Sequence, residues 1–141
     1  MAKKTTMPHM NVLLVDDSSL MRQAIGDIVK GMDGLNIVGE AANGAEALAL
    51  LKTLSVDLIL LDIEMPVMGG LEFLEQARRY CDARVIVISS VAQLGSNEAV
   101  SALDLGAQDI VPKPSGVLSL DMKDTRSAAL RTAIEECAQG W

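Results

Sequence analysis

Leu58-Ile59-Leu60-Leu61-Asp62 is the stretch that decides the fold, because four apolar residues in a row end abruptly at a carboxylate. A strand with water on one face alternates apolar and polar residues, whereas a strand covered on both faces is apolar throughout. Similar runs occupy residues 12–15 and 85–88, and shorter strand candidates occupy 37–38 and 109–111. The sequence therefore predicts five strands in a sheet whose two faces are covered.

The segments between these runs have helical periodicity. Apolar side chains recur there at the three- and four-residue spacing of one helix face. Helices are expected from residue 18 to Gly31, after Asn43-Gly44, after Gly69-Gly70, over 98–105 and around 130–137. Strands that alternate with helices imply right-handed crossovers, so the predicted class is α/β with a doubly wound parallel sheet.

The composition is that of one acidic globular domain. The chain has 141 residues, half of them apolar, and 12 basic against 19 acidic residues give a net charge of −7. This balance argues against nucleic-acid binding, which needs clustered positive charge. No apolar run approaches the roughly 18 residues of a membrane span. We expect a cytoplasmic domain over residues 11–138, with a flexible tail at 1–10 and a short tail at 139–141.

Polar residues stand where the predicted strands end. Asp16-Asp17 follow the first strand, Asp62 the third, Ser89 the fourth and Lys113 the fifth. Ligands of open α/β sheets bind beyond the carboxyl ends of the strands. These three carboxylates, one hydroxyl and one amine are therefore expected to converge on one site.

The charges of this group indicate what it binds. Three carboxylates and one ammonium leave a net charge of −2, which one Mg²⁺ would neutralise. Mg²⁺ prefers oxygen ligands and is typically held by one or two carboxylates, waters and a phosphate. A metal and an ammonium can neutralise phosphoryl oxygens, a hydroxyl can donate to one of them, and a carboxylate can accept the group covalently.

Each residue also has a simpler interpretation. Asp17 or Ser18 could cap the first helix, Asp62 could cap a loop, Ser89 could be an ordinary strand-end hydroxyl, and Lys113 could be a solvated loop lysine. The occurrence of all these residues at the ends of predicted strands favours a shared functional site over these separate roles.

Four motifs in combination resemble the receiver domain of bacterial two-component response regulators. They are Val15-Asp16-Asp17-Ser18, Leu61-Asp62-Ile63-Glu64-Met65-Pro66, Ile88-Ser89-Ser90 and Val111-Pro112-Lys113-Pro114. The resemblance covers residues 11–138 and implies a flavodoxin-like (βα)5 fold with strand order 2-1-3-4-5. Pro112 has no N–H to donate to a sheet, which independently places the fifth strand at an edge.

The resemblance also assigns roles. Asp62 would accept a phosphoryl group from a histidine kinase, and Ser89 and Lys113 would be the switch hydroxyl and the phosphate partner. Asp17, Asp62 and the backbone carbonyl of Glu64 would bind Mg²⁺, with Asp16 acting mainly through water. The Lys113–Pro114 bond would be cis, and the fourth helix, fifth strand and last helix would form the partner surface.

The connection from Ser89 to Lys113 spans 24 positions, which is slightly long for this fold. Together with Leu105-Gly106-Ala107, Ser115-Gly116 and Leu118-Ser119-Leu120, it is similar to the receiver half of the chemotaxis protein-glutamate methylesterase. The chain has no Gly-x-Ser-x-Gly nucleophile elbow, and its one histidine is His9. We therefore expect a receiver without esterase activity, either a truncated chain or a stand-alone domain.

Three features depart from the receiver pattern. Gly69 stands where an Asp is usual, which predicts a looser loop, and Ile110 stands where many receivers have an aromatic residue. Trp141 ends the chain after Gly140 and is expected to be disordered. Three other classes of protein are alternatives: a flavin-binding domain, a hydrolase that forms an aspartyl-phosphate, and an interaction domain that works without phosphorylation. Asp16-Asp17 would repel a flavin phosphate, and the usual second Asp of such hydrolases is replaced by Glu64.

Overall fold

The computed structural model describes residues 9–65, 67–90, 93–114 and 125–139. In this part of the chain five parallel strands form one sheet with the order β2-β1-β3-β4-β5, which confirms the predicted fold class and topology. The strands are β1 (Met10–Val15), β2 (Leu35–Ala41), β3 (Leu58–Leu61), β4 (Arg84–Ser89) and β5 (Asp109–Pro112). The helices are α1 (Ser19–Lys30), α2 (Gly44–Leu51), α3 (Gly70–Ala77), α4 (Asn97–Asp104) and α5 (Thr125–Gln139).

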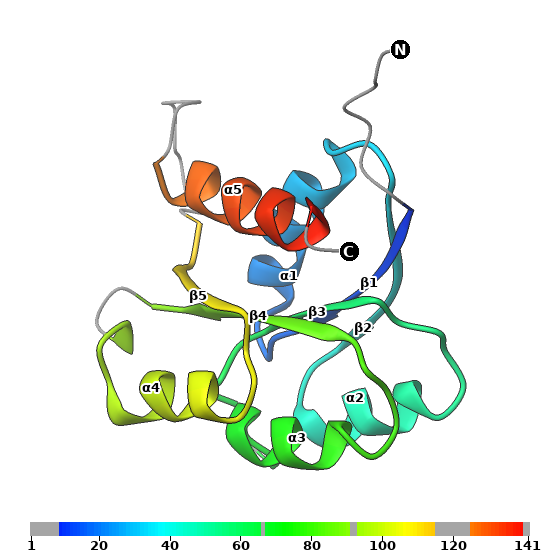
Figure 1. Ribbon diagram of the computed structural model, residues 1–141, viewed down its shortest axis with the longest axis vertical. Helices are drawn as coiled ribbons and strands as arrows, with labels where there is room; N and C mark the ends of the chain where they lie inside the picture. Colours follow the sequence, from blue (N-terminus) through cyan, green and yellow to red (C-terminus); the bar gives the residue numbers. More distant parts are fainter. Residues whose placement is uncertain (1–8, 66, 91–92, 115–124, 140–141) are drawn as a thin grey trace.

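The sheet lies between two helical layers. Figure 1 shows α1 and α5 on one face and α2, α3 and α4 on the other. Successive residues of a strand point to opposite faces, so each strand supplies both layers of the core. Leu13 and Ile59 pack under α2 and α3, while Val12 and Leu58 pack under α1 and α5. This two-sided burial explains the unbroken apolar runs.

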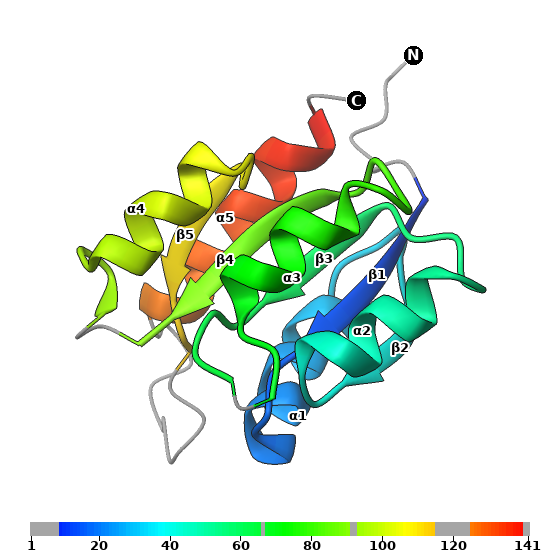
Figure 2. The same ribbon diagram turned by 90° about the horizontal axis from the view of Figure 1, so that it is seen from below.

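The register of the strands brings their carboxyl ends together. Figure 2 shows that the strands run in one direction across the sheet. Val15 pairs with Leu61, so Asp16 and Asp62 leave the sheet side by side. Ser89 pairs with Pro112, which places Lys113 just beyond the end of β4.

The two edge strands, β2 and β5, correspond to the two shorter strand candidates at 37–38 and 109–111. β5 pairs with β4 alone among the described strands, as predicted from Pro112. β2 extends over Leu35–Ala41, well beyond the expected 37–38. Of its seven residues only Ala41 is buried and Asn36 and Glu40 are exposed, because an edge strand packs less closely. This mixed composition hid the length of the strand.

Ordered elements extend one residue beyond the expected domain at each end. Met10 opens β1 and Gln139 ends α5. Residues 1–8 and 140–141 of the expected tails lie outside the described residues, as do the motif residues from 115 to 120. No helix in the described part of the chain is both long and apolar enough to cross a membrane.

Candidate functional site

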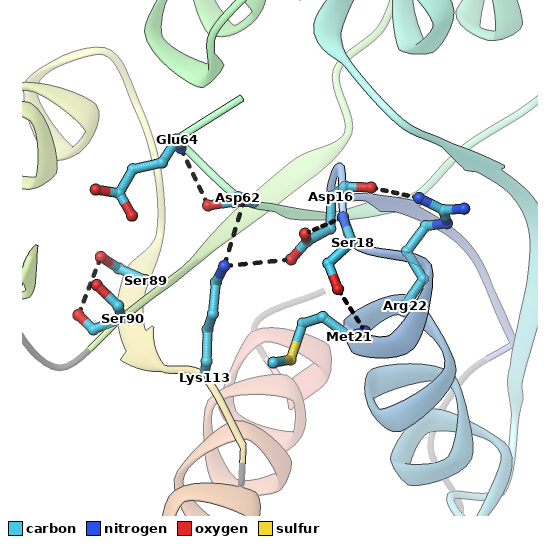
Figure 3. Close-up of polar contacts among 9 residues, drawn as sticks. All are labelled: Asp16, Ser18, Met21, Arg22, Asp62, Glu64, Ser89, Ser90 and Lys113. Atoms are coloured by element: carbon cyan, nitrogen blue, oxygen red, sulfur yellow. Dashed lines mark hydrogen bonds and ion pairs between the residues drawn. The ribbon is translucent and has the colours of Figure 1, made fainter. Parts of the chain in front are cut away.

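Three carboxylates meet at the carboxyl end of the sheet, and Figure 3 shows two of them, Asp16 and Asp62. One oxygen from each of Asp16, Asp17 and Asp62 lies within 4.8 Å of the others. Asp16 and Asp62 are each 1% exposed, whereas Asp17 is exposed. The acidic cluster, as we call these three residues, therefore has two buried members and one at its mouth.

Lys113 faces the two buried carboxylates. Its Nζ lies 3.6 Å from Asp16 Oδ2 and 3.5 Å from Asp62 Oδ2. Its backbone N–H donates to the carbonyl of Ser89 at 2.8 Å, so the end of β4 fixes where the lysine begins. The side chain is only 21% exposed. Lys113 is thus part of the site and not a solvated loop lysine.

Each buried carboxylate is held by one of its oxygens. Asp16 Oδ1 accepts from the N–H of Ser18 at 2.9 Å, and Asp62 Oδ1 accepts from the N–H of Glu64 at 3.0 Å. Ser18 also caps α1 by accepting from the N–H of Met21 at 3.1 Å. The cap is therefore Ser18, and the carboxylate of Asp17 lies in the acidic cluster.

The second oxygen of each buried carboxylate lacks a hydrogen bond. Asp16 Oδ2 and Asp62 Oδ2 are buried without a hydrogen-bond partner. Lys113 attracts both, but 3.5 Å is long for a hydrogen bond. A buried polar atom without a partner is costly and rare in folded proteins. These two oxygens therefore mark where a ligand would sit.

Burial also changes the ionisation of the cluster. Loss of water raises the pKa of Asp62 to about 6, and the charge of Asp16 adds to this effect. The N–H of Glu64 and the ammonium of Lys113 oppose it. The pKa of Asp16 is raised by the same burial. A cation bound among these oxygens would favour their ionised forms.

The donor set fits a hard divalent cation. It offers carboxylate oxygens only, two of them buried and without hydrogen bonds, which is the chemistry Mg²⁺ prefers. The expected contribution of Glu64 is its backbone carbonyl. The Glu64 side chain is exposed and is not a member of the acidic cluster.

Ser89 lies at the site but makes no hydrogen bond to the acidic cluster. Its side chain is fully buried, and its hydroxyl donates to the carbonyl of Ser90 at 3.3 Å. Figure 3 shows both serines on the far side of Lys113 from Asp16. The switch role of Ser89 stays a prediction.

The expected cis bond is wrong. Lys113–Pro114 is trans, as are the other peptide bonds of the described residues. The trans form of an X–Pro bond is favoured by about 0.5–1 kcal/mol when nothing in the fold opposes it. In this form Lys113 reaches both carboxylates.

Two further observations concern the surrounding loops. Gly69 is the N-cap residue of α3 and makes no side-chain cap hydrogen bond, and the looser loop expected here stays a prediction. Sequence reasoning did not single out Arg22, whose guanidinium donates to the carbonyl of Asp16. The only signal was its place one turn after the cap, where a helical side chain leans back toward the N-terminus.

A parallel sheet of this strand order, with an acidic cluster and a lysine at its carboxyl end, is the arrangement found in receiver domains. Residues 12–123 match the family model described as response regulator receiver domain. The chain belongs to this family.

Its relatives include methylesterases with a receiver region. The chain is 43% identical over 125 residues to protein-glutamate methylesterase/protein-glutamine glutaminase 1 of Syntrophomonas wolfei, covering 89% of this chain and 36% of that protein. It is 48% identical over 122 residues to the corresponding protein of Treponema pallidum, covering 86% and 28%. The chain thus spans about a third of the length of these curated relatives.

Solved structures give the same result. The response regulator domain of Thermotoga maritima CheB is similar with a TM-score of 0.79 and 34% identity, covering 94% of this chain and 98% of that one. CheY6 of R. sphaeroides, solved in complex with the P1 domain of CheA3, gives 0.75 and 40%, covering 95% and 99%. Both the chemotaxis lineage and the receiver fold expected from the motifs are confirmed.

Proposed function

We propose that this chain is the phosphoacceptor domain of a chemotaxis-type two-component relay and that Asp62 takes a phosphoryl group from a histidine kinase. The observation that carries the proposal is the state of Asp62. One oxygen is fixed by the N–H of Glu64, while the other is buried, without a hydrogen bond, and 3.5 Å from Lys113 Nζ. A carboxylate held in this way is positioned to act as a nucleophile.

The chemistry follows from these positions. Asp62 Oδ2 attacks the phosphorus of the donor, a P–O bond forms, and the P–N bond of a phosphohistidine breaks as the imidazole leaves. Lys113 neutralises charge on the transferred group. Asp16, Asp17, Asp62 and the backbone carbonyl of Glu64 would hold Mg²⁺, which when bound supplies further neutralisation of the phosphoryl oxygens. Ser89 would then donate to one of those oxygens.

The rest of the proposal concerns partners. The donor would be a histidine kinase, and the output would be a partner protein or an effector domain that docks on α4, β5 and α5. A regulatory region of a longer methylesterase is the variant supported by the relatives, since the match covers only about a third of them. We place this activity in the cytoplasm, in residues 11–138.

The test is Mg²⁺-dependent labelling by acetyl phosphate, followed by intact mass. We expect one phosphoryl group on the wild-type chain and none on Asp62→Asn or after chelation. Asp57→Asn is the matched control, because Asp57 is a partly buried aspartate whose carboxylate accepts from the N–H of Asn11 at the opposite end of the sheet. Equal labelling of Asp62→Asn would contradict the assignment of Asp62 as the acceptor. Absence of Mg²⁺-dependent labelling in the wild-type chain would favour an interaction domain that works without phosphorylation.

A further inference from the structure

Arg22 joins the acidic cluster to the edge of the sheet. It lies in the first turn of α1, and its Nη1 donates to the backbone carbonyl of Asp16 at 2.5 Å. Its Nε donates to Glu40 Oε1, near the end of β2, at 3.0 Å. The Arg22 side chain is only 17% exposed, and Figure 3 shows its contact with the carbonyl of Asp16.

The carbonyl that Arg22 binds belongs to the peptide group between Asp16 and Asp17. The orientation of that peptide plane determines how the Asp17 backbone leaves β1. Asp16 is fixed further by its N–H, which donates to the carbonyl of Ala41, and by its Oδ1, which accepts from Ser18. Asp17 is the exposed member of the cluster, and its backbone N–H belongs to the peptide plane that Arg22 holds, so a rotation of that plane would move its carboxylate.

Glu40 gives the guanidinium its own orientation. Arginine presents N–H groups in a rigid fork, so one side chain can bind two acceptors in fixed directions. Here the fork spans the carbonyl of Asp16 and the carboxylate of Glu40. The Glu40 side chain is 52% exposed, so the ion pair itself adds little to stability. The contact is better explained as an anchor for Arg22.

We propose that Arg22 is a positioning residue for the divalent cation of the acidic cluster, acting through the carbonyl of Asp16 and anchored by Glu40. The inference rests on the proposed function, since it concerns the same cation. Groups that orient metal ligands without touching the metal typically contribute about 10–100-fold to metal affinity. Arg22 is not a ligand, because its guanidinium is a cation without an acceptor.

A purely structural clamp is the competing explanation, and the chain contains a matched example. Arg78 Nη1 donates to the carbonyl of Ala83 at 2.9 Å, and its Nη2 donates to the carbonyl of Gly106 at 3.2 Å. This arginine ties the turn before β4 to the turn before β5, at the opposite end of the strands from the acidic cluster. Arg78→Gln therefore removes the same charge and two similar contacts without touching the site.

The experiment titrates Mg²⁺ into the unphosphorylated chain, with amide chemical shifts or calorimetry as the readout, and measures unfolding by denaturant in parallel. We expect Arg22→Gln to weaken Mg²⁺ binding about tenfold, in the range given for groups that orient metal ligands. Glu40→Ala should weaken it by a smaller factor, because Arg22 keeps one partner. Arg78→Gln should lose stability but keep the wild-type affinity.

The outcomes separate the two proposals. Wild-type affinity in both Arg22→Gln and Glu40→Ala would overturn the positioning role and leave the proposed function standing. Equal weakening by Arg22→Gln and Arg78→Gln would overturn it as well, since loss of stability would then explain the effect. If the wild-type chain neither binds Mg²⁺ nor accepts a phosphoryl group from acetyl phosphate, both proposals fail.

Discussion

At the scale of single residues, the ionisation of Asp62 links the site to the stability of the fold. Its pKa is raised from 3.8 to about 6, first by burial and then by the charge of Asp16. Between pH 3.8 and about pH 6 the Asp62 carboxyl is ionised in the unfolded chain and protonated in the native chain. The free energy of unfolding therefore falls as pH rises through this window, and the ionised carboxylate costs about 3 kcal/mol above it.

Replacing Asp62 should therefore stabilise the chain in the absence of Mg²⁺. We expect Asp62→Asn to raise the free energy of unfolding by about 1–3 kcal/mol at pH 8. The difference should shrink at pH 4, where the wild-type carboxyl is protonated. Denaturant unfolding at the two pH values in the presence of chelator measures it. Added Mg²⁺ should stabilise the wild type at pH 8 more than the variant. A difference independent of pH would contradict the raised pKa.

Glu64 is placed to affect how long the phosphoryl group survives. Its N–H is fixed to Asp62 Oδ1, and its side chain is exposed at the mouth of the site. The negative charge would oppose or misorient an attacking water. We expect Glu64→Ala to shorten the half-life of phosphorylated protein severalfold, measured by decay of the label after donor removal. Glu72→Ala, an exposed acid on α3, should leave it unchanged. An unchanged half-life in Glu64→Ala would show that its side chain points away from the path of water.

At the scale of elements, the start of α3 leaves no room for a side chain. A Cβ added at Gly70 would lie 2.6 Å from Ile63 Cα, which is backbone and cannot rotate away. Gly95, before α4, has nothing within 4 Å of the equivalent position. We expect Gly70→Ala to lower the free energy of unfolding by about 1–3 kcal/mol and Gly95→Ala to leave it nearly unchanged. Denaturant unfolding compares the pair, and equal effects would contradict this account of the β3–α3 loop.

The elements also show what sequence reasoning can reach. β3 was predicted with its exact bounds, because a strand covered on both faces has one unmistakable pattern. The length of β2 was underestimated, because an edge strand can include exposed polar residues such as Asn36 and Glu40. The acidic cluster was predictable, because topology alone brings the strand ends together. The contact of Arg22 with Asp16 was not, because it depends on a rotamer and not on spacing.

At the scale of the whole molecule, the site is connected to α4 and β5 through the end of β4. Lys113 donates from its backbone to the carbonyl of Ser89, and Ser89 pairs with Pro112. Ile110 packs, partly buried, against the core under α2, α3 and α4. Val100 and Leu103 remain 53% and 47% exposed on α4. A movement of Ser89 toward a phosphoryl group would therefore change the positions of residues in β5, which lies beside an exposed apolar part of α4.

We therefore expect phosphorylation to alter the face formed by α4, β5 and α5. A moved hydroxyl leaves a volume that another side chain must fill, or a cavity lowers stability. Ile110 is the candidate, and because it is smaller than an aromatic ring, the two states should differ by only about 1–3 kcal/mol, as in ordinary allosteric coupling. Amide chemical shifts with beryllofluoride and Mg²⁺ should change at residues 98–112 in the wild type and not in Asp62→Asn. Changes confined to the loops around Asp62 would show that this face is not the output surface.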